Sequence, residues 1–161
     1  MAEPRVGIGY DVHRLVPARR LVLGGVEFEH ELGLEGHSDA DVALHALCDA
    51  LLGAAALGDI GRHFPPGDPR YKDADSLELL RATRDLVARR GYRLGNCDLT
   101  IVAERPRIGP HALLMRERIA AALDADLDQI SVKATTNERL GFVGREEGIA
   151  AWAVATIVPA P

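Results

Sequence analysis

The stretch ADVALHALCDALLGAAAL, residues 40–57, carries the strongest secondary-structure signal in the chain. Apolar side chains surround nearly the whole of its helical projection, so we expect a helix over about residues 39–57 that is buried on most sides. Ser38 or Asp39 is a suitable N-cap for this helix. The other segments of the chain must therefore supply the layers that cover it.

One face of this helix is nevertheless polar. Asp41, His45 and Asp49 recur at positions i, i+4 and i+8, which stack on one side of a helix. Buried charges must be paired, hydrogen-bonded or bound to a metal. A solvated stripe and a functional site fit this spacing about equally well, and His45 alone fits a satisfied core histidine. The choice between them depends on what lies opposite the stripe.

A second polar motif, GYDVHR at residues 9–14, falls in a strand predicted over residues 5–14. Alternate residues of a strand share a face, so Asp11 and His13 point the same way. With His45 they offer three ligands that zinc accepts, and three protein ligands with one open position are typical of a catalytic zinc site. The Asp-x-His pair alone is weak evidence, whereas its combination with H-S-D-x-D-x-x-x-H at residues 37–45 is much more specific.

The remaining segments alternate between strand and helix patterns. We expect strands at 21–29 (with Gly24-Gly25 as a turn or bulge), 97–104, 130–135 and 149–158, helices at 76–90 and 110–124, and irregular chain at 30–38, 58–71 and 140–148. These elements predict one α/β (α+β) domain over residues 1–161, with a mixed sheet of four-stranded type covered by helices on one face. Hairpin-like strand pairs near both ends favour the mixed sheet over a doubly wound one.

Composition narrows the class of function. The 161 residues are 47% apolar and carry a formal net charge of -5, which argues against nucleic acid or an anionic membrane as the main partner. No apolar run is long enough to span a membrane, and no signal peptide is evident at the N-terminus. Cys48 and Cys97 are far apart and predict reduced, buried thiols, so we expect a cytoplasmic protein.

Three stretches together resemble a known family. GYDVHR (9–14), GHSDADVALHALCDALLGAAALGDIGRHFP (36–65) and KATTNERLGFVGREEGIA (133–150) are similar to the 2-C-methyl-D-erythritol 2,4-cyclodiphosphate synthase family, and the resemblance extends over about residues 5–158. It implies a phosphorus–oxygen lyase of the non-mevalonate isoprenoid pathway. The substrate would be 4-diphosphocytidyl-2-C-methyl-D-erythritol 2-phosphate, and the products the cyclic diphosphate and CMP. It also implies a homotrimer with active sites between subunits.

The resemblance implies two kinds of metal. One zinc ion per subunit would be held by Asp11, His13 and His45, with a β-phosphate oxygen in the fourth position. A magnesium or manganese ion, bridging the α- and β-phosphates of the substrate, would have Glu138 as its protein ligand. Metal charge would explain how an acidic protein binds a polyanionic substrate.

The same resemblance assigns the substrate contacts. His37 and Thr136 match the transition-state stabilisers, and Ser38 matches a phosphate contact. The methylerythritol hydroxyls would be bound by Asp59, Ile60 and Gly61, with Phe64 to Asp68 as the following loop. The cytidine pocket would include Ala103, Arg107, Ile108, Gly109 and Thr135, and further contacts would come from Phe142 and Arg145. Without the resemblance, residues 135–138 would read as an ordinary strand end, Phe142 as core and Arg145 as part of a solvated charge run.

Some positions depart from the family pattern or leave alternatives open. Pro66 stands where the loop usually has Asp, which removes one carboxylate, and Arg107 stands where Lys is common. We expect Asp41 and Asp49 to orient His45 or its neighbours. Two other functions remain open at this point: a zinc-dependent hydrolase using metal-bound water, with His37 or Asp49 as base, and a non-catalytic trimer that binds isoprenoid diphosphates in a central cavity.

Overall fold

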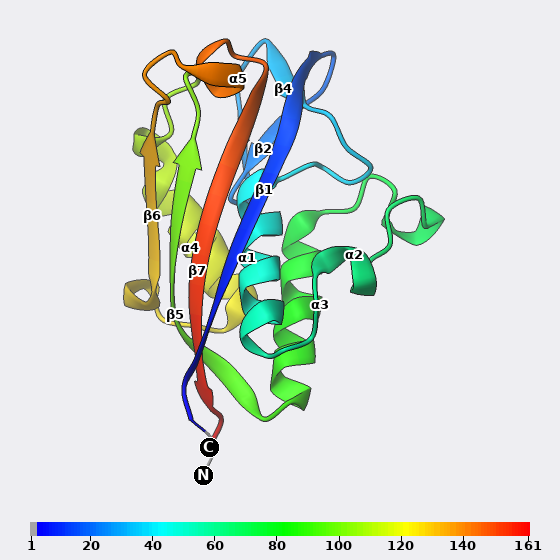
Figure 1. The fold of residues 1–161 in the computed structure, drawn as a ribbon, viewed down its shortest axis with the longest axis vertical. Helices are drawn as coiled ribbons and strands as arrows, with labels where there is room; N and C mark the ends of the chain where they lie inside the picture. Colours follow the sequence, from blue (N-terminus) through cyan, green and yellow to red (C-terminus); the bar gives the residue numbers. More distant parts are fainter. Residues whose placement is uncertain (1–2) are drawn as a thin grey trace.

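Five strands form a mixed sheet in the computed structural model, which describes residues 3–161 (Figure 1). Their order is β4 (Leu32–Leu34), β1 (Arg5–Pro17), β7 (Gly148–Pro159), β5 (Tyr92–Val102) and β6 (Ile130–Thr135). All neighbours are antiparallel except β5 and β6, which are parallel. The first two residues of the predicted domain lie outside the described chain.

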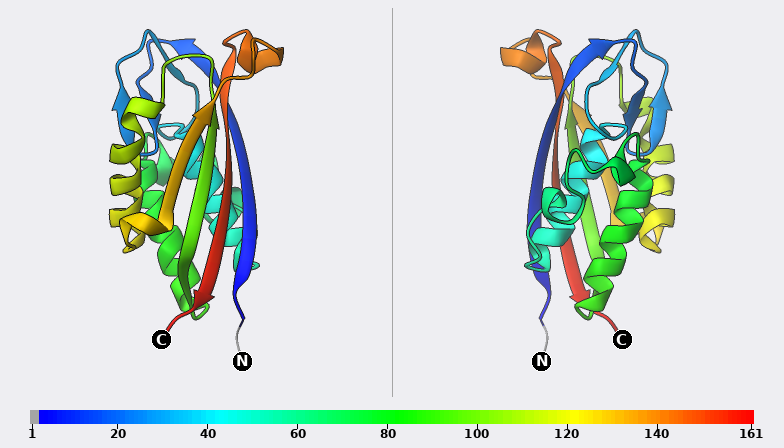
Figure 2. Two further views of the ribbon diagram at one scale, coloured as in Figure 1. Left: turned by 90° about the vertical axis from the view of Figure 1, so that its left-hand side faces the viewer. Right: turned by 90° about the vertical axis from the view of Figure 1, so that its right-hand side faces the viewer.

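Three helices cover one face of this sheet, and the other face is bare in Figure 2. They are α1 (Val42–Ala54), α3 (Ser76–Arg89) and α4 (Ala112–Leu123). Smaller elements complete the fold: the β2–β3 ribbon (Leu21–Leu23 with Val26–Phe28), the short helices α2 (Ile60–His63) and α5 (Gly141–Gly144), and three 3₁₀ turns at Pro69–Tyr71, Gly109–His111 and Leu127–Gln129. This arrangement confirms the predicted fold class. No helix among residues 3–161 has the length and apolar character needed to cross a membrane.

Two local predictions were wrong. The turn expected at Gly24-Gly25 is present, but it divides residues 21–29 into the separate β2–β3 ribbon, so this segment does not pair with β1 as a single strand. The C-terminal strand β7 instead pairs with β1 along Arg5 to Arg14. The fifth strand, β4, comes from the segment predicted to be a loop, and it pairs with only the last three residues of β1.

The predicted central helix is real but shorter than expected. It begins at Val42, and Asp41 is its N-cap, in place of Ser38 or Asp39, because Ala40 has a left-handed backbone (φ +56°) that no helix accepts. It ends at Ala54, two residues before Ala56, which is also left-handed. All ten residues on its apolar sides are buried, as its composition predicts.

Close approach between β1 and α1 brings the polar groups together. Gly7 and Gly9 face the helix, and a Cβ atom on Gly9 would lie 1.8 Å from the carbonyl oxygen of Ala46. Only glycine leaves room for this backbone contact. Asp11 and His13 continue the same strand face, so they too are directed at α1.

The opposite face of the sheet is apolar and uncovered. Val6, Ile8, Tyr10 and Val12 alternate with the helix-facing residues of β1, and each is at least 40% exposed. Exposed Val154 and Trp152 of β7 lie across from Ile8 and Tyr10, and the Tyr10 and Trp152 rings are 4.5 Å apart. Contiguous exposed apolar patches of this kind are typical of interaction surfaces.

Candidate metal centre and active site

Three side chains with metal-binding atoms meet where β1 faces α1. The Asp11 Oδ2 atom lies 2.9 Å from His13 Nε2 and 3.1 Å from His45 Nδ1. The two ring nitrogens are 3.4 Å apart. Asp11, His13 and His45 are the sole group of this kind found among the described residues. The structure thus brings together the three ligands that strand and helix spacing had predicted.

Electrostatics favour a cation at this point. Burial alone would raise the pKa of Asp11, but hydrogen bonds and charge from His13 and His45 outweigh burial and lower it to about 2. Burial opposes a charged His13 as well, yet the hydrogen bond and charge of Asp11 raise the pKa of His13 above its usual value. Without metal, the Asp11 carboxylate is therefore ionised and favours protonation of His13. A metal ion bound to these residues would take the place of that proton.

Backbone and hydroxyl groups fix the orientation of the two rings. His13 Nδ1 donates to the Glu35 carbonyl oxygen over 2.7 Å, which leaves Nε2 to face Asp11. His45 turns its other nitrogen, Nε2, toward Ser76 Oγ at 3.0 Å and Ser38 Oγ at 3.2 Å. Each imidazole thus presents one nitrogen to the group and anchors the other, as metal-binding histidines do.

A cavity of about 220 Å³ opens in front of the three ligands. Its walls include His37, Ser38, Ile60, Gly61 and Phe64, all of which the sequence had assigned to substrate, together with Pro66, Tyr71 and Leu79. His37 is anchored by donating from Nε2 to the Asp68 carbonyl oxygen over 3.0 Å. The Asp68 carboxylate itself is bound to the side chain and the backbone N–H of Arg70. Only the backbone carbonyl of Asp68 therefore reaches His37.

Asp49 and Asp41 differ in what they orient. Asp49 accepts a 2.7 Å hydrogen bond from the Ile60 N–H, and so it fixes the start of α2 beside the cavity, where Asp59 is the N-cap. Asp41 does not contact the His45 ring. Its buried carboxylate accepts from the N–H groups of Leu44, Gly24 and Gly25 over 2.7–3.1 Å and ties the β2–β3 turn to α1. Burial raises the pKa of Asp41 to about 7. Neither carboxylate is hydrogen-bonded to the His45 ring, so the expected orientation of His45 is not found: Asp49 positions the Ile60 segment of the cavity wall, and Asp41 is structural.

Glu138 and Thr136 lie elsewhere. They line a second cavity, of about 510 Å³, which shares no lining residue with the first. Glu138 and Arg139 both have left-handed backbones, with φ of +51° and +60°. Glu104 holds this strained loop, because its two carboxylate oxygens accept from the N–H groups of Asn137 (2.7 Å) and Arg139 (3.0 Å).

The other predicted residues are divided between the neighbourhood of this loop and a third cavity. Ala103 N–H bonds to the Thr135 carbonyl, so the two predicted cytidine segments are adjacent. Beyond Ala103, Ile108 is buried, Arg107 is exposed and Gly109 begins a 3₁₀ turn. Phe142 of α5 borders a third cavity next to His13, and Arg145 follows α5 and forms an ion pair with Glu147.

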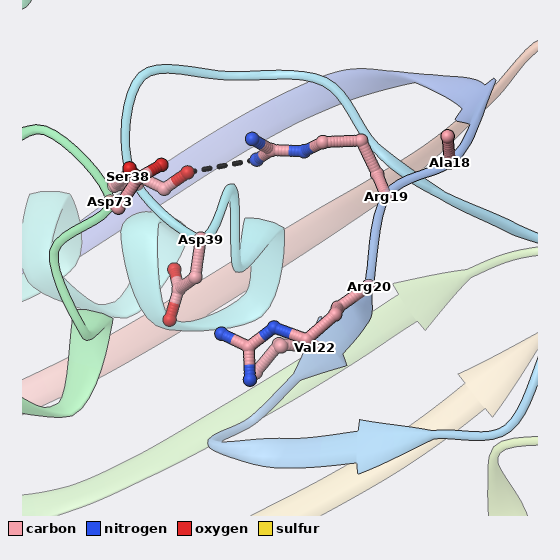
Figure 3. Close-up of a pocket in the computed structure, with 7 residues that line it drawn as sticks. All are labelled: Ala18, Arg19, Arg20, Val22, Ser38, Asp39 and Asp73. Atoms are coloured by element: carbon pink, nitrogen blue, oxygen red, sulfur yellow. Dashed lines mark hydrogen bonds between the residues drawn. The ribbon is translucent and has the colours of Figure 1, made fainter.

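Three contributors were missed by the sequence analysis: Asp39, Ser76 and Glu104. Asp39 Oδ2 accepts from the Ser76 N–H over 2.9 Å, and the Ser76 hydroxyl donates to Asp39 Oδ1. Asp39 also borders a separate cavity of about 260 Å³, in which Figure 3 shows the Arg20 side chain extending toward the Asp39 carboxylate. Periodicity carries no signal for these residues, because each acts on a partner far away in the chain.

Comparison with known proteins agrees with this geometry. The model of the YgbB family matches residues 4–158, almost the whole chain. The chain belongs to the YgbB family. A relative from Symbiobacterium thermophilum, called 2-C-methyl-D-erythritol 2,4-cyclodiphosphate synthase, is 68% identical over 152 residues, which are 94% of this chain and 97% of the relative.

Solved structures related to this YgbB member share its fold over nearly the full length. The bifunctional IspDF from Campylobacter jejuni superposes with a TM-score of 0.94 at 43% identity, covering 98% of this chain and 43% of that longer one. IspF from Plasmodium falciparum, in a CDP complex, superposes with a TM-score of 0.88 at 32% identity, covering 100% of this chain and 99% of that one.

Proposed function

We propose that this chain, over residues 1–161 as one domain, converts 4-diphosphocytidyl-2-C-methyl-D-erythritol 2-phosphate into 2-C-methyl-D-erythritol 2,4-cyclodiphosphate and CMP. One observation carries the proposal: Asp11, His13 and His45 converge on a point at the wall of a cavity that His37 and Ser38 also line. A relative at 68% identity bears the name of this synthase.

The reaction requires positioning more than an activated side chain. The 2-phosphate oxygen attacks the β-phosphorus, the bond from β-phosphorus to the bridging oxygen breaks, and CMP leaves with that oxygen. Nucleophile and electrophile belong to one molecule, so the protein must bring two anionic groups together and hold the diphosphate in line. His37 and Ser38 bind phosphate oxygens from the cavity wall, and Thr136 serves as the second transition-state stabiliser.

Zinc fits the three ligands. Atoms bound tetrahedrally at the usual zinc distances lie about 3.3 Å from one another. The separations here are 2.9, 3.1 and 3.4 Å, and the ligand set is one carboxylate and two imidazoles. Zinc bound by Asp11, His13 and His45, one ion per subunit, would neutralise and polarise a phosphate of the substrate. Glu138 would hold a magnesium or manganese ion on the diphosphate.

The remaining residues bind the two ends of the substrate. Asp59, Ile60 and Gly61 take the methylerythritol hydroxyls, with Phe64 and Asp68 in the adjoining loop. The segment from Ala103 through Arg107 and Ile108 to Gly109, with Thr135, takes the cytidine, and Phe142 and Arg145 complete the surroundings. The relative from Plasmodium falciparum forms a complex with CDP, which supports a cytidine diphosphate ligand here.

A homotrimer accounts for the separation of the two half-sites. Asp11 and His13 lie on β1 and His45 lies on α1, whereas Glu138 follows β6 at the far edge of the sheet (Figure 1). One chain leaves the two cavities apart, whereas a closed head-to-tail ring places the β6 side of one copy beside the β1 side of the next. The bare apolar face around Tyr10 and Trp152 would be buried inside the ring. Three copies follow from the family resemblance, and the two buried free thiols suit the cytoplasm.

Product analysis tests the proposed reaction. The protein is incubated with the cytidylated 2-phosphate, zinc and magnesium, and the products are resolved by ³¹P NMR. We expect equal amounts of CMP and the cyclic diphosphate. CMP with an uncyclised diphosphate product would instead indicate a zinc-dependent phosphohydrolase, and no CMP would leave only a binding role.

A further inference from the structure

A chain of hydrogen bonds runs from His45 away from the metal ligands. Nδ1 of His45, in the first turn of α1, faces Asp11, whereas Nε2 lies 3.0 Å from the Oγ atom of Ser76, the first residue of α3. Ser76 is fully buried. When a metal occupies Nδ1, the single proton of the neutral ring is on Nε2 and needs an acceptor, because an unpaired buried N–H is costly.

Ser76 is held so that it can only accept from His45. Its one hydroxyl hydrogen is donated to Asp39 Oδ1, and its backbone N–H is bonded to Asp39 Oδ2 at 2.9 Å. A carboxylate has no hydrogen to give. The order of donation is therefore fixed along the whole chain, from His45 to Ser76 and from Ser76 to Asp39.

Ser38 is the competing neighbour of Nε2. Its hydroxyl oxygen lies 3.2 Å from Nε2 and already accepts from the Ala40 N–H over 3.1 Å. The hydroxyl hydrogen of Ser38 has no acceptor fixed for it, and Ser38 lines the substrate cavity. Ser76 is thus the nearer acceptor and the one whose hydrogen is already committed.

We propose that Ser76 and Asp39 are positioning residues for the metal centre: they accept the Nε2 proton of His45 and so hold its Nδ1 toward Asp11 and His13. Neither residue belongs to the three-ligand group or lines the cavity in front of it. The inference rests on the proposed function in one respect, namely that the three ligands bind a metal. A carboxylate acting on a metal-bound histidine, here through a serine, raises the basicity of the ligand and restricts its rotation.

The experiment measures zinc affinity with the metal alone, by competition with a chromophoric chelator, in the full-length protein. Ser76→Ala and Asp39→Asn should each weaken zinc binding by about 10- to 100-fold. Asparagine cannot replace Asp39 here, because each Asp39 oxygen accepts a hydrogen bond from a backbone N–H, one from Ser76 and the other from Asp41. In either orientation the NH₂ group of Asn would face one of these N–H donors. Ser76→Thr should restore binding. Asp73→Asn, an acid in the wall of the same cavity as Asp39, should leave the affinity unchanged.

A second readout separates positioning from general stability. In the zinc-loaded wild type, the ring N–H of His45, assigned with His45→Gln, should give a proton NMR resonance protected from solvent exchange. Ser76→Ala should remove that protection even where its melting temperature matches that of Ser76→Thr. An unchanged resonance and affinity in Ser76→Ala, or a greater loss of affinity in Ser38→Ala, would overturn the proposal. Retention of zinc by His13→Ala would instead show that the metal assignment itself is wrong.

Discussion

Gly9 of β1 and Ala46 of α1 are in direct backbone contact, so close that a Cβ atom on Gly9 would stand 1.8 Å from the Ala46 carbonyl oxygen. His45 directly precedes Ala46, and Asp11 follows Gly9 by two residues. The backbone contact therefore places His45 opposite Asp11. The metal ligands therefore depend on a glycine that has no chemistry of its own.

Gly9→Ala should separate the strand from the helix and abolish the metal centre. The clash is with backbone on both sides, so we expect a loss of about 3 kcal/mol or more in the free energy of unfolding and loss of tight zinc binding. Gly53→Ala is the matched control, because no atom lies within 4 Å of the added Cβ. It should stabilise α1 by about 0.5–1 kcal/mol, as measured by urea denaturation. A fully stable, zinc-binding Gly9→Ala protein would contradict the role of the contact.

Asp49→Ala should affect substrate binding and spare the metal. The variant loses the hydrogen bond to the Ile60 N–H, and so it frees the α2 segment beside the cavity. We expect KM to rise by about tenfold, roughly 1.4 kcal/mol of binding, with one zinc per chain retained. Asp49→Asn keeps one acceptor oxygen and should lie between the wild type and Asp49→Ala. An unchanged KM in Asp49→Ala would show that α2 needs no such anchor.

The Asp11–His13 pair predicts a pH dependence of the metal-free protein. The pKa of Asp11 falls from 3.8 to about 2 on folding, so its contribution is present above pH 3.8 and is lost as pH falls toward 2. The pKa of His13 rises above 6.5, so its contribution is full below pH 6.5 and is lost as pH rises through the folded pKa. The Asp11–His13 pair thus stabilises the fold most between pH 3.8 and pH 6.5.

Asp11→Asn should therefore cost more in the metal-free protein at about pH 5.5 than at about pH 8.5, by on the order of 1 kcal/mol, since the hydrogen bond has a charged donor only at the lower pH. Urea denaturation at both pH values, with chelator present, measures this difference. Equal costs at the two pH values would contradict the pairing. Zinc binding should follow the opposite trend and tighten as pH rises, because His13 must lose its proton.

The bare sheet face predicts the effect of a surface charge. Trp152→Asp places a carboxylate in the apolar patch beside Tyr10. Burying it inside the proposed trimer would be costly, so sedimentation velocity should show monomers that still bind zinc but have lost activity. Glu117→Gln, an exposed change on α4 in the helix layer that covers the opposite face of the sheet, is the control and should sediment as a trimer. A trimeric, active Trp152→Asp protein would show that this face lies outside the interface.

The sequence could predict what depends on local periodicity. Asp11 and His13 share a strand face and His45 lies on the polar stripe of α1, so these rules indicated the three ligands together, although the stripe alone fitted a solvated face equally well. The same rules could not pair β1 with β7 across more than 130 residues, nor divide 21–29 into a ribbon. The hydrophobic pattern of a strand does not indicate which distant strand it pairs with.

Roles that depend on tertiary hydrogen bonds were likewise out of reach. Asp41 and Asp39 are two residues apart and look alike in sequence, yet Asp41 holds a turn and Asp39 holds Ser76. Ala40, which lies between Asp39 and Asp41, has a left-handed backbone conformation, and the two side chains are therefore directed at different neighbours. Only Asp39 is linked to His45, through Ser76. Glu104 could not be linked to the Glu138 loop for the same reason.

The most direct test of the shared active site is complementation between two inactive variants. His45→Ala breaks the metal half-site and Glu138→Ala breaks the other half-site. Equal amounts are co-assembled, and CMP release is measured with zinc and magnesium present. If each site takes its metal ligands from one copy and Glu138 from its neighbour, random assembly leaves about a quarter of the sites intact, and about a quarter of wild-type activity should return. Activity no higher than that of the separate variants would mean that each chain builds its site alone, and would contradict the shared site.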